Sequence, residues 1–156
     1  MRLALSALAL LLAACGGQRT GDAQTGISLR IPSDWQVRSN LMGMALWAHP
    51  RDAACSGTQV SVTRLPGAPS SIDDAALLDD RIRRFTHNSH EVELIRRGHD
   101  QAELRHRQGS VAQQALLQVH RHDHALDVVV AAAAPACFAT VRRTLERIAA
   151  SYRPGP

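Results

Sequence analysis

Apolar and polar residues alternate along three segments of the first half of the chain and predict half-buried β-strands. The first segment is 26–31, and it stops at Pro32 because proline cannot donate to a strand ladder. The other two are 44–48 and 59–64. A loop rich in proline, glycine and serine, 65–71, then ends this group of strands.

A period of three to four residues replaces the alternation in two places and predicts two amphipathic helices. The first helix is expected over 72–86, with Ser71 as its N-cap. Its apolar positions are Ala75, Leu78, Ile82 and Phe85. The second helix is expected to open at Pro135. Its apolar positions are Phe138, Val141, Leu145, Ile148 and Tyr152.

Four further strands are predicted between the helices, at 90–96, 102–108, 113–121 and 125–132. Their connections are short enough for hairpins, so neighbouring strands run antiparallel. The pattern therefore predicts an α+β domain, an antiparallel sheet of six to seven strands flanked by two main helices in an α-β-α sandwich.

The N-terminus has the pattern of a lipoprotein signal peptide, residues 1–14. Arg2 precedes an apolar stretch that is too short to span a membrane. The stretch ends in Leu-Ala-Ala-Cys, which resembles the bacterial lipobox, so Cys15 is expected to carry diacylglycerol and palmitate-type acyl chains. Gly16 follows in place of aspartate, which by the same resemblance implies sorting to the outer membrane. An ordinary secretory signal with a chance cysteine is the alternative.

Residues 15–25 are polar and without periodicity, so they are expected to form the lipidated cysteine and a flexible tether. The folded domain is then expected over 26–154. Ten flexible residues span roughly 17–19 Å, which places the domain close to the membrane, facing the periplasm.

Charge and composition exclude several classes of function. The formal charge is +4, every basic residue is arginine, and the chain has no lysine. Schiff-base chemistry and Walker-A phosphate loops, which need lysine, are therefore excluded. Export makes nucleic acid an unexpected partner, and five aromatic residues are too few for a base-stacking surface.

Two cysteines remain once Cys15 is lipidated. Cys55 and Cys137 would lie in an oxidising compartment, where two thiols are expected to form a disulfide. Two buried free thiols, or a catalytic cysteine, are the alternatives.

Several of these features together resemble the PsbP-like group, which includes PsbP, DcrB and LpqN-type lipoproteins. They are the opening GISLRIPSDW, the helix after the third predicted strand, the hairpin run, and the closing helix that ends Ala-Ser-Tyr-Arg-Pro at 150–154. The resemblance implies an α-β-α sandwich, without catalysis, that acts on other polypeptides as an adaptor, assembly factor or chaperone. Pro32 and Trp35 match its motif and are expected to serve a strand-end turn and packing.

Histidines form the one candidate site for a cofactor. His120, His122 and His124 alternate, and on a continuous strand they would share one face and bind a transition metal, with His106 from the paired strand as a fourth ligand. A turn expected near 122–123 would separate the rings instead.

The sequence thus predicts a lipid-anchored protein-binding domain without a catalytic residue. A metal- or small-ligand-binding lipoprotein that uses the histidines, and an immunity or inhibitor lipoprotein against an envelope toxin, are the alternative functions. The arginines of the first helix and of the strands after it, 81–107, are a candidate basic face for anionic lipid or an acidic partner.

Overall fold

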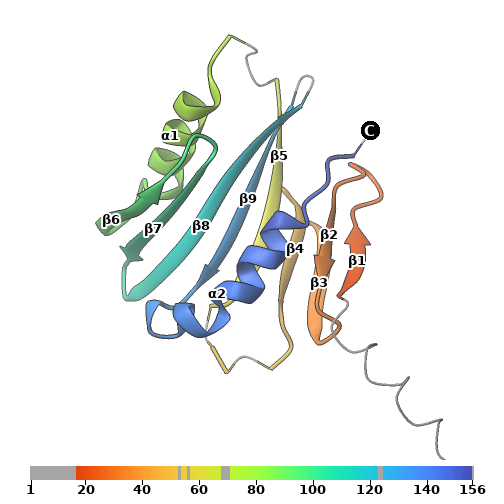
Figure 1. The fold of residues 1–156 in the computed structure, drawn as a ribbon, viewed down its shortest axis with the longest axis horizontal. Helices are drawn as coiled ribbons and strands as arrows, with labels where there is room; N and C mark the ends of the chain where they lie inside the picture. The colour runs from red at the N-terminus through yellow and green to blue at the C-terminus, as the bar shows by residue number, and fades with distance from the viewer. Residues whose placement is uncertain (1–16, 53, 56, 68–70, 123–124, 156) are drawn as a thin grey trace, which may run out of the picture.

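The structure is a computed structural model that describes residues 17–52, 54–55, 57–67, 71–122 and 125–155. It contains a seven-stranded antiparallel sheet, a two-stranded antiparallel sheet and two helices (Figure 1). The predicted α+β class is therefore confirmed. In chain order the elements are β1 (Gln18–Gly21), β2 (Ser28–Ile31), β3 (Trp35–Leu41), β4 (Met44–Pro50), β5 (Gln59–Pro66), α1 (Asp74–Phe85), β6 (His90–Arg97), β7 (Gln101–Gln108), β8 (Val111–His122), β9 (Ala125–Ala133) and α2 (Pro135–Ala150).

The large sheet has the order β3-β4-β5-β9-β8-β7-β6, so β3 and β6 are its two edges. All seven strands expected from the alternation are present. The first of them, β2, lies in the small sheet, where it pairs with β1. The strand β9 is nearly all apolar because it lies at the centre of the sheet and is covered on both faces.

The strand β3 is absent from the sequence-based prediction. It is an edge strand in which only Trp35 is buried, and its polar residues hide the alternation. The turn to β4 has positive φ at Met42 (51°) and Gly43 (81°), as a two-residue hairpin requires. An exposed Met-Gly pair is a weak signal for such a turn, which explains the omission.

The strand β1 corrects the expected tether. Residues 18–21 are polar and largely exposed, yet they form a four-residue ladder with β2. A strand that pairs on one side and buries little side-chain surface needs no alternation, so the sequence pattern does not reveal it. The folded domain therefore includes residues 18–21, which lie before its predicted start at residue 26.

Two hydrophobic cores lie on opposite faces of the large sheet. On one face, α1 inserts Leu77 and Leu78 against the apolar residues of β7, β8 and β9. On the other face, α2 inserts Phe138, Leu145 and Ile148, and β2 adds its own apolar residues. The small sheet therefore extends the layer that α2 begins, and Figure 1 shows α1 and the β1–β2 pair at opposite ends of the domain.

One helix detail differs from the sequence-based prediction. The N-cap of α1 is Asp73, whose carboxylate accepts a hydrogen bond from the Ala76 amide at 2.9 Å, in place of Ser71. Asp80 pairs with Arg84 one turn on, at 3.0 Å. In the described part of the chain, no helix has the length and hydropathy of a membrane span.

The expected disulfide between Cys55 and Cys137 is confirmed, with Cα atoms 5.9 Å apart. It joins the loop between β4 and β5 to the first turn of α2. The bond closes a span of 82 residues, and it therefore connects two elements that are distant in the chain.

Candidate functional site

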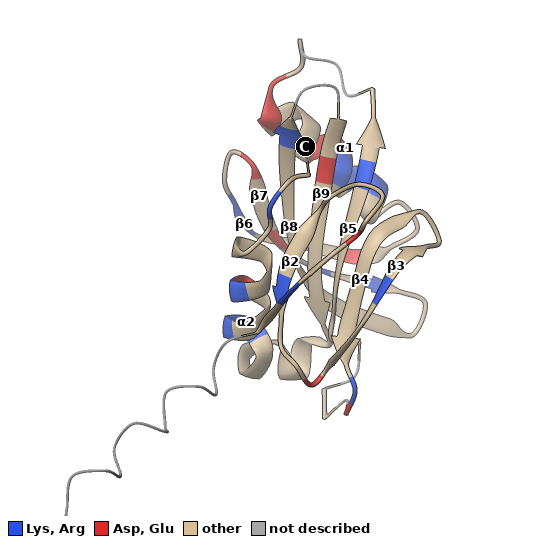
Figure 2. Ribbon diagram, turned by 90° about the vertical axis from the view of Figure 1, so that its right-hand side faces the viewer, with Lys and Arg blue, Asp and Glu red and all other residues tan. Residues whose placement is uncertain are grey.

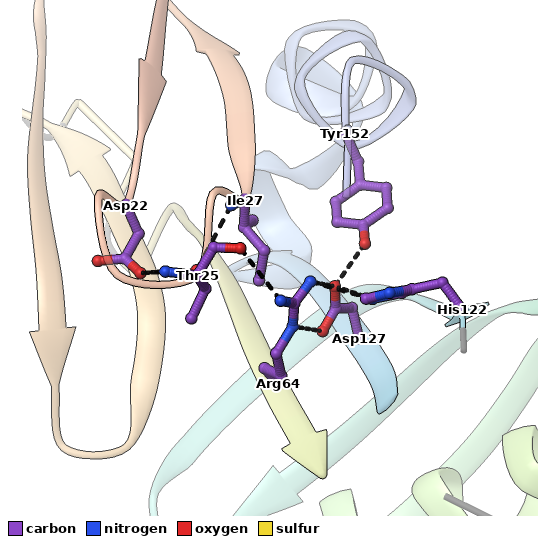
Figure 3. Close-up of polar contacts among 7 residues, drawn as sticks. All are labelled: Asp22, Thr25, Ile27, Arg64, His122, Asp127 and Tyr152. Carbon is purple, nitrogen blue, oxygen red and sulfur yellow. Dashed lines mark hydrogen bonds and ion pairs between the residues drawn. The ribbon is translucent and has the colours of Figure 1, made fainter. Parts of the chain in front are cut away.

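A buried carboxylate at the centre of the large sheet organises the main polar cluster of the domain (Figure 3). The side chain of Asp127, on β9, is fully buried. Its partners come from three other segments: Arg64 from β5, His122 from the end of β8, and Tyr152 from the residues after α2. We call these four residues the Asp127 cluster.

The carboxylate of Asp127 accepts four hydrogen bonds. Arg64 donates from Nε to Oδ1 at 2.9 Å and from Nη2 to Oδ2 at 2.8 Å. Tyr152 Oη donates to Oδ2 at 2.5 Å. His122 Nε2 lies 2.8 Å from the same oxygen and 3.0 Å from Arg64 Nη2, and it donates to Asp127 in the tautomer that carries its proton on Nε2. Both carboxylate oxygens are therefore occupied by donors from the protein.

These contacts set the protonation states in the cluster. Burial would raise the pKa of Asp127, but the hydrogen bonds from Arg64, Tyr152 and His122 outweigh it and hold this pKa below its usual range. Burial, together with the hydrogen bond to Asp127, raises the pKa of Tyr152 above that of a free phenol. The cluster therefore joins a buried carboxylate to donors from three other segments of the domain.

The cluster also holds the small sheet in place. Arg64 Nη1 donates to the carbonyl oxygen of Thr25, in the loop between β1 and β2, at 3.1 Å. Thr25 in turn donates from its amide and its hydroxyl to Asp22 at 2.7 and 2.6 Å. Asp127 therefore connects the N-terminal hairpin and the C-terminal segment to the centre of the large sheet, as Figure 3 shows.

The structure brings together only part of the predicted histidine site. The strand β8 continues to His122, so His120 and His122 do share a face, and His122 belongs to the strand and not to the expected turn. His120 stacks on Tyr152 with ring centroids 4.3 Å apart. His106 lies on the opposite face, where it contacts Phe85 of α1, which corrects its assignment as a fourth ligand.

His124 lies outside the described residues, and so does Asp123. Among the residues that the structure describes, no group of three or more histidine, cysteine, aspartate or glutamate side chains is arranged to hold a metal. His122 donates to Asp127 instead. Cys15, the predicted lipidation site, also lies outside the described residues.

Two buried histidines predict a loss of stability in mild acid. Burial lowers the pKa of His106 and of His120 below the ordinary value of 6.5. Because the folded pKa lies below the unfolded one, the unfolded chain binds more protons below about pH 6.5, and the free energy of unfolding falls as the pH decreases.

We expect urea midpoints to fall between pH 7 and pH 5 in the wild type, and to fall less in His106→Gln, which removes one of the two groups. The exposed His87 provides the matched control, and His87→Gln is expected to keep the wild-type slope. Parallel pH profiles for all three proteins would contradict this assignment.

The sequence pattern identifies the members of the Asp127 cluster only as separate residues. An aspartate inside the apolar run of β9 is the one signal that points to it, since a charged residue is rarely buried without a partner. Arg64 and Tyr152 lie 63 and 25 residues away from Asp127 in the chain. Only the sheet order β5-β9-β8 and the end of α2 bring them together.

The arrangement of two helices on a seven-stranded antiparallel sheet, with α2 and a short N-terminal hairpin on one face, is a PsbP-like fold. No protein-family model and no curated protein matches the chain in sequence. The solution structure of cyanobacterial PsbP (CyanoP) from Synechocystis sp. PCC 6803 is similar, with a TM-score of 0.63, 19% identity, and coverage of 96% of this chain and 98% of that chain. The predicted resemblance in fold is therefore confirmed.

Two other solved structures share the fold. LpqN of Mycobacterium tuberculosis, described as involved in cell envelope biogenesis, has a TM-score of 0.51 and 15% identity, and the match covers 90% of this chain and 86% of LpqN. A protein of Bacteroides thetaiotaomicron VPI-5482 has a TM-score of 0.58 and 12% identity, over 90% of this chain and 49% of that chain.

Proposed function

We propose that the chain is a lipid-anchored, non-catalytic domain of the bacterial cell envelope that binds another envelope protein, as an adaptor, assembly factor or chaperone. The Leu-Ala-Ala-Cys sequence that ends at Cys15 supports the anchor. The fold shared with LpqN, a protein involved in cell envelope biogenesis, supports the location. The filled acceptor positions of Asp127 support a structural role for the main polar cluster.

The observation that carries the protein-binding role is the exposed edge strand β6. All eight of its residues are exposed, including three apolar side chains: Val92 (47% exposed), Leu94 (48%) and Ile95 (40%). The strand pairs only with β7, so one row of backbone donors and acceptors has no strand partner among the described residues. An extended segment of a partner protein can add to such an edge as a further strand.

The ion pairs and bulges of β6 limit which strands can pair with its free edge. Glu91 and Glu93 pair with Arg107 and Arg105 of β7, at 2.9 and 3.0 Å, and bulges interrupt the register on both sides of Glu93 and Leu94. Charged side chains and bulges hinder indiscriminate strand pairing. The edge is therefore suited to a selected partner more than to self-association.

Native mass spectrometry of the full-length protein, extracted from its own membranes in mild detergent, tests the proposal. We expect the wild type to retain a polypeptide and Leu94→Arg to lose most of it, because the substitution places a charge in the apolar part of β6. Arg83→Gln, on the exposed side of α1, is the control and is expected to retain the partner. A bare wild-type protein, equal retention by Leu94→Arg, or a bound metal alone would contradict the proposal.

A further inference from the structure

Five exposed arginines gather on the side of the domain formed by β1, β2, α2 and the C-terminal segment. We call this surface the arginine face; it consists of Arg19, Arg30, Arg143, Arg147 and Arg153. Figure 2 shows this side, with basic positions on β2 and on α2. The surface differs from the basic face expected at 81–107, which lies on α1, β6 and β7.

Contacts show that the five residues are neighbours. Arg19 and Arg30 are directly opposite each other in the β1–β2 ladder. Arg153 forms the adjacent bridge, to Ser28, and the Arg19 guanidinium donates to the carbonyl oxygen of Ser151 at 3.4 Å. Arg147 Nε donates to the carbonyl oxygen of Arg143 at 3.3 Å. Arg30 and Arg147 line one groove, which connects the two groups, so the arginine face extends from the small sheet to α2.

The five residues of the arginine face lack acidic partners, as do Arg38 and Arg51 elsewhere in the described part of the chain. Each arginine of α1, β6 and β7 is in an ion pair with an aspartate or a glutamate. Within the described residues, no carboxylate lies within 4.0 Å of a guanidinium group of the arginine face. Among the described residues, the arginines of α1, β6 and β7 are therefore each paired with a carboxylate, whereas the five of the arginine face are not.

The arrangement of Arg19 is unfavourable for the isolated domain. Like charges placed directly opposite each other in a ladder destabilise a sheet. Desolvation, and then the charges of Arg153 and Arg30, lower the pKa of Arg19. An anionic surface that binds these three arginines together would remove the repulsion.

The chain enters the domain beside this face. A side chain on Gly17 would have its Cβ 2.8 Å from the carbonyl oxygen of Ile31, so the backbone passes too close to β2 for any other residue. Gly17, Arg30 and Arg147 line one groove of ≈ 800 Å³, which also contains Asp34 and Asp52. Within the groove, two arginines face two acidic residues, so the excess of positive charge comes from Arg19, Arg143 and Arg153 outside it.

Cys15 is two residues before Gly17, and two residues span at most about 7 Å. This distance is shorter than the screening length of about 8 Å at physiological salt. A lipid on Cys15 would therefore hold the arginine face within reach of the charges on the membrane surface.

We propose that the arginine face binds the phosphate groups of anionic phospholipids in the membrane that holds the Cys15 lipid. This inference rests on the proposed lipid anchor. Guanidinium groups bind phosphate through paired N–H donors, and each arginine at an anionic surface strengthens the association about fivefold. The domain then has a fixed orientation, with β6 at the far end of the sheet directed away from the lipid.

Arginine-specific dicarbonyl modification of the full chain in vesicles tests this orientation. Neutral phosphatidylcholine vesicles are compared with vesicles that contain phosphatidylglycerol. We expect the arginine face to react at least threefold more slowly in the anionic vesicles, since each arginine strengthens the association about fivefold. This protection is expected to disappear in high salt. Arg83, which is 72% exposed on α1, is the internal control and is expected to react equally in both.

The double variant Arg30→Gln/Arg153→Gln is expected to abolish most of the protection of Arg147 in anionic vesicles, because it removes two of the charges that bind the phosphate groups. Neither Arg30 nor Arg153 makes a side-chain ion pair among the described residues, so the variant is expected to melt no lower than the wild type. The matched variant Arg83→Gln is expected to keep the protection. A lower melting temperature in the double variant would show that Arg30 and Arg153 stabilise the domain. It would contradict the repulsion inferred between these two residues and Arg19.

Intact mass separates this inference from the proposed anchor. A lipid-sized mass increase on Cys15 with equal modification in both kinds of vesicle would overturn the arginine face as a lipid surface and leave the anchor intact. Protection in anionic vesicles without lipid on Cys15 would contradict the proposed anchor and support the binding of anionic phospholipid by the arginine face. Protection only when envelope proteins are added would assign the face to an acidic protein and overturn the inference.

Discussion

Replacing both Cys55 and Cys137 with serine is expected to lower the free energy of unfolding by roughly 4–5 kcal/mol. The disulfide closes a span of 82 residues, and on the chain-entropy account its loss gives the unfolded chain many more conformations. Because small domains are stable by only about 5–15 kcal/mol, this change removes a large part of the stability.

Urea unfolding of the wild type and the double-serine variant, each with and without reductant, measures this effect. We expect the midpoint of the wild type to fall in reductant and to approach that of the variant, which itself does not respond. An intact mass of the oxidised wild type that lacks the two-hydrogen deficit, or equal midpoints for all four samples, would show that the bond does not form or does not stabilise the fold.

The second large effect is expected for Asp127→Asn. The substitution removes the negative charge and places an amide group opposite three donors, those of Arg64, His122 and Tyr152. Breaking a buried ion pair typically costs about 3–5 kcal/mol. The side chain of Arg64 is 20% exposed and reaches water, so we expect the lower end, about 3 kcal/mol, or a melting temperature lower by on the order of 10 °C.

The acid limb of the stability profile provides an independent check on Asp127. Its folded pKa lies below the unfolded value near 3.8, so its contribution is present above that value and is lost as the pH falls through the folded pKa. Asp127→Asn is expected to lack this contribution and to show a shallower loss of stability below about pH 4. Asp34→Asn, on the exposed turn before β3, is the control and is expected to follow the wild type. A variant that melts within about 1 °C of the wild type would show that the cluster is not a structural connection.

These two connections explain how the ends of the chain are held. The disulfide attaches the start of α2 to the loop before β5, and the Asp127 cluster attaches the segment after α2 to the centre of the sheet. The same cluster holds the loop between β1 and β2 through Arg64 and Thr25. The strand β1, where the proposed anchor joins the domain, is therefore tied to the core and not only to β2.

The proposed partner surface and the proposed lipid surface lie far apart in the domain. The edge strand β6 is at one end of the large sheet, and the small sheet covers the other end (Figure 1). A domain that rests on lipid through its arginine face would present β6 to the periplasm. The two proposals are thus compatible, and each has its own variant, Leu94→Arg for the first and Arg30→Gln/Arg153→Gln for the second.

Sequence alone determined those parts of the protein that leave a periodic or local pattern. Hydrophobic patterning identified seven strands, the three-to-four spacing identified both helices, and short connections identified the antiparallel order. The pairing of Cys55 with Cys137 followed from counting cysteines in a chain that is expected to be exported. Cys15 is also recognisable from a local pattern, because the apolar run and the small residues of the lipobox-like sequence come directly before it in the chain.

Tertiary structure decided everything that depends on residues distant in the chain. The strand β1 and the edge strand β3 bury too little surface to show alternation, and only pairing with β2 and β4 defines them. The face of each histidine follows from sheet register, which placed His106 on one side and His120 on the other. The Asp127 cluster and the arginine face unite segments from both halves of the chain. Their charges interact over a few ångströms in space, and such contacts cannot be predicted from the spacing of the residues in the sequence.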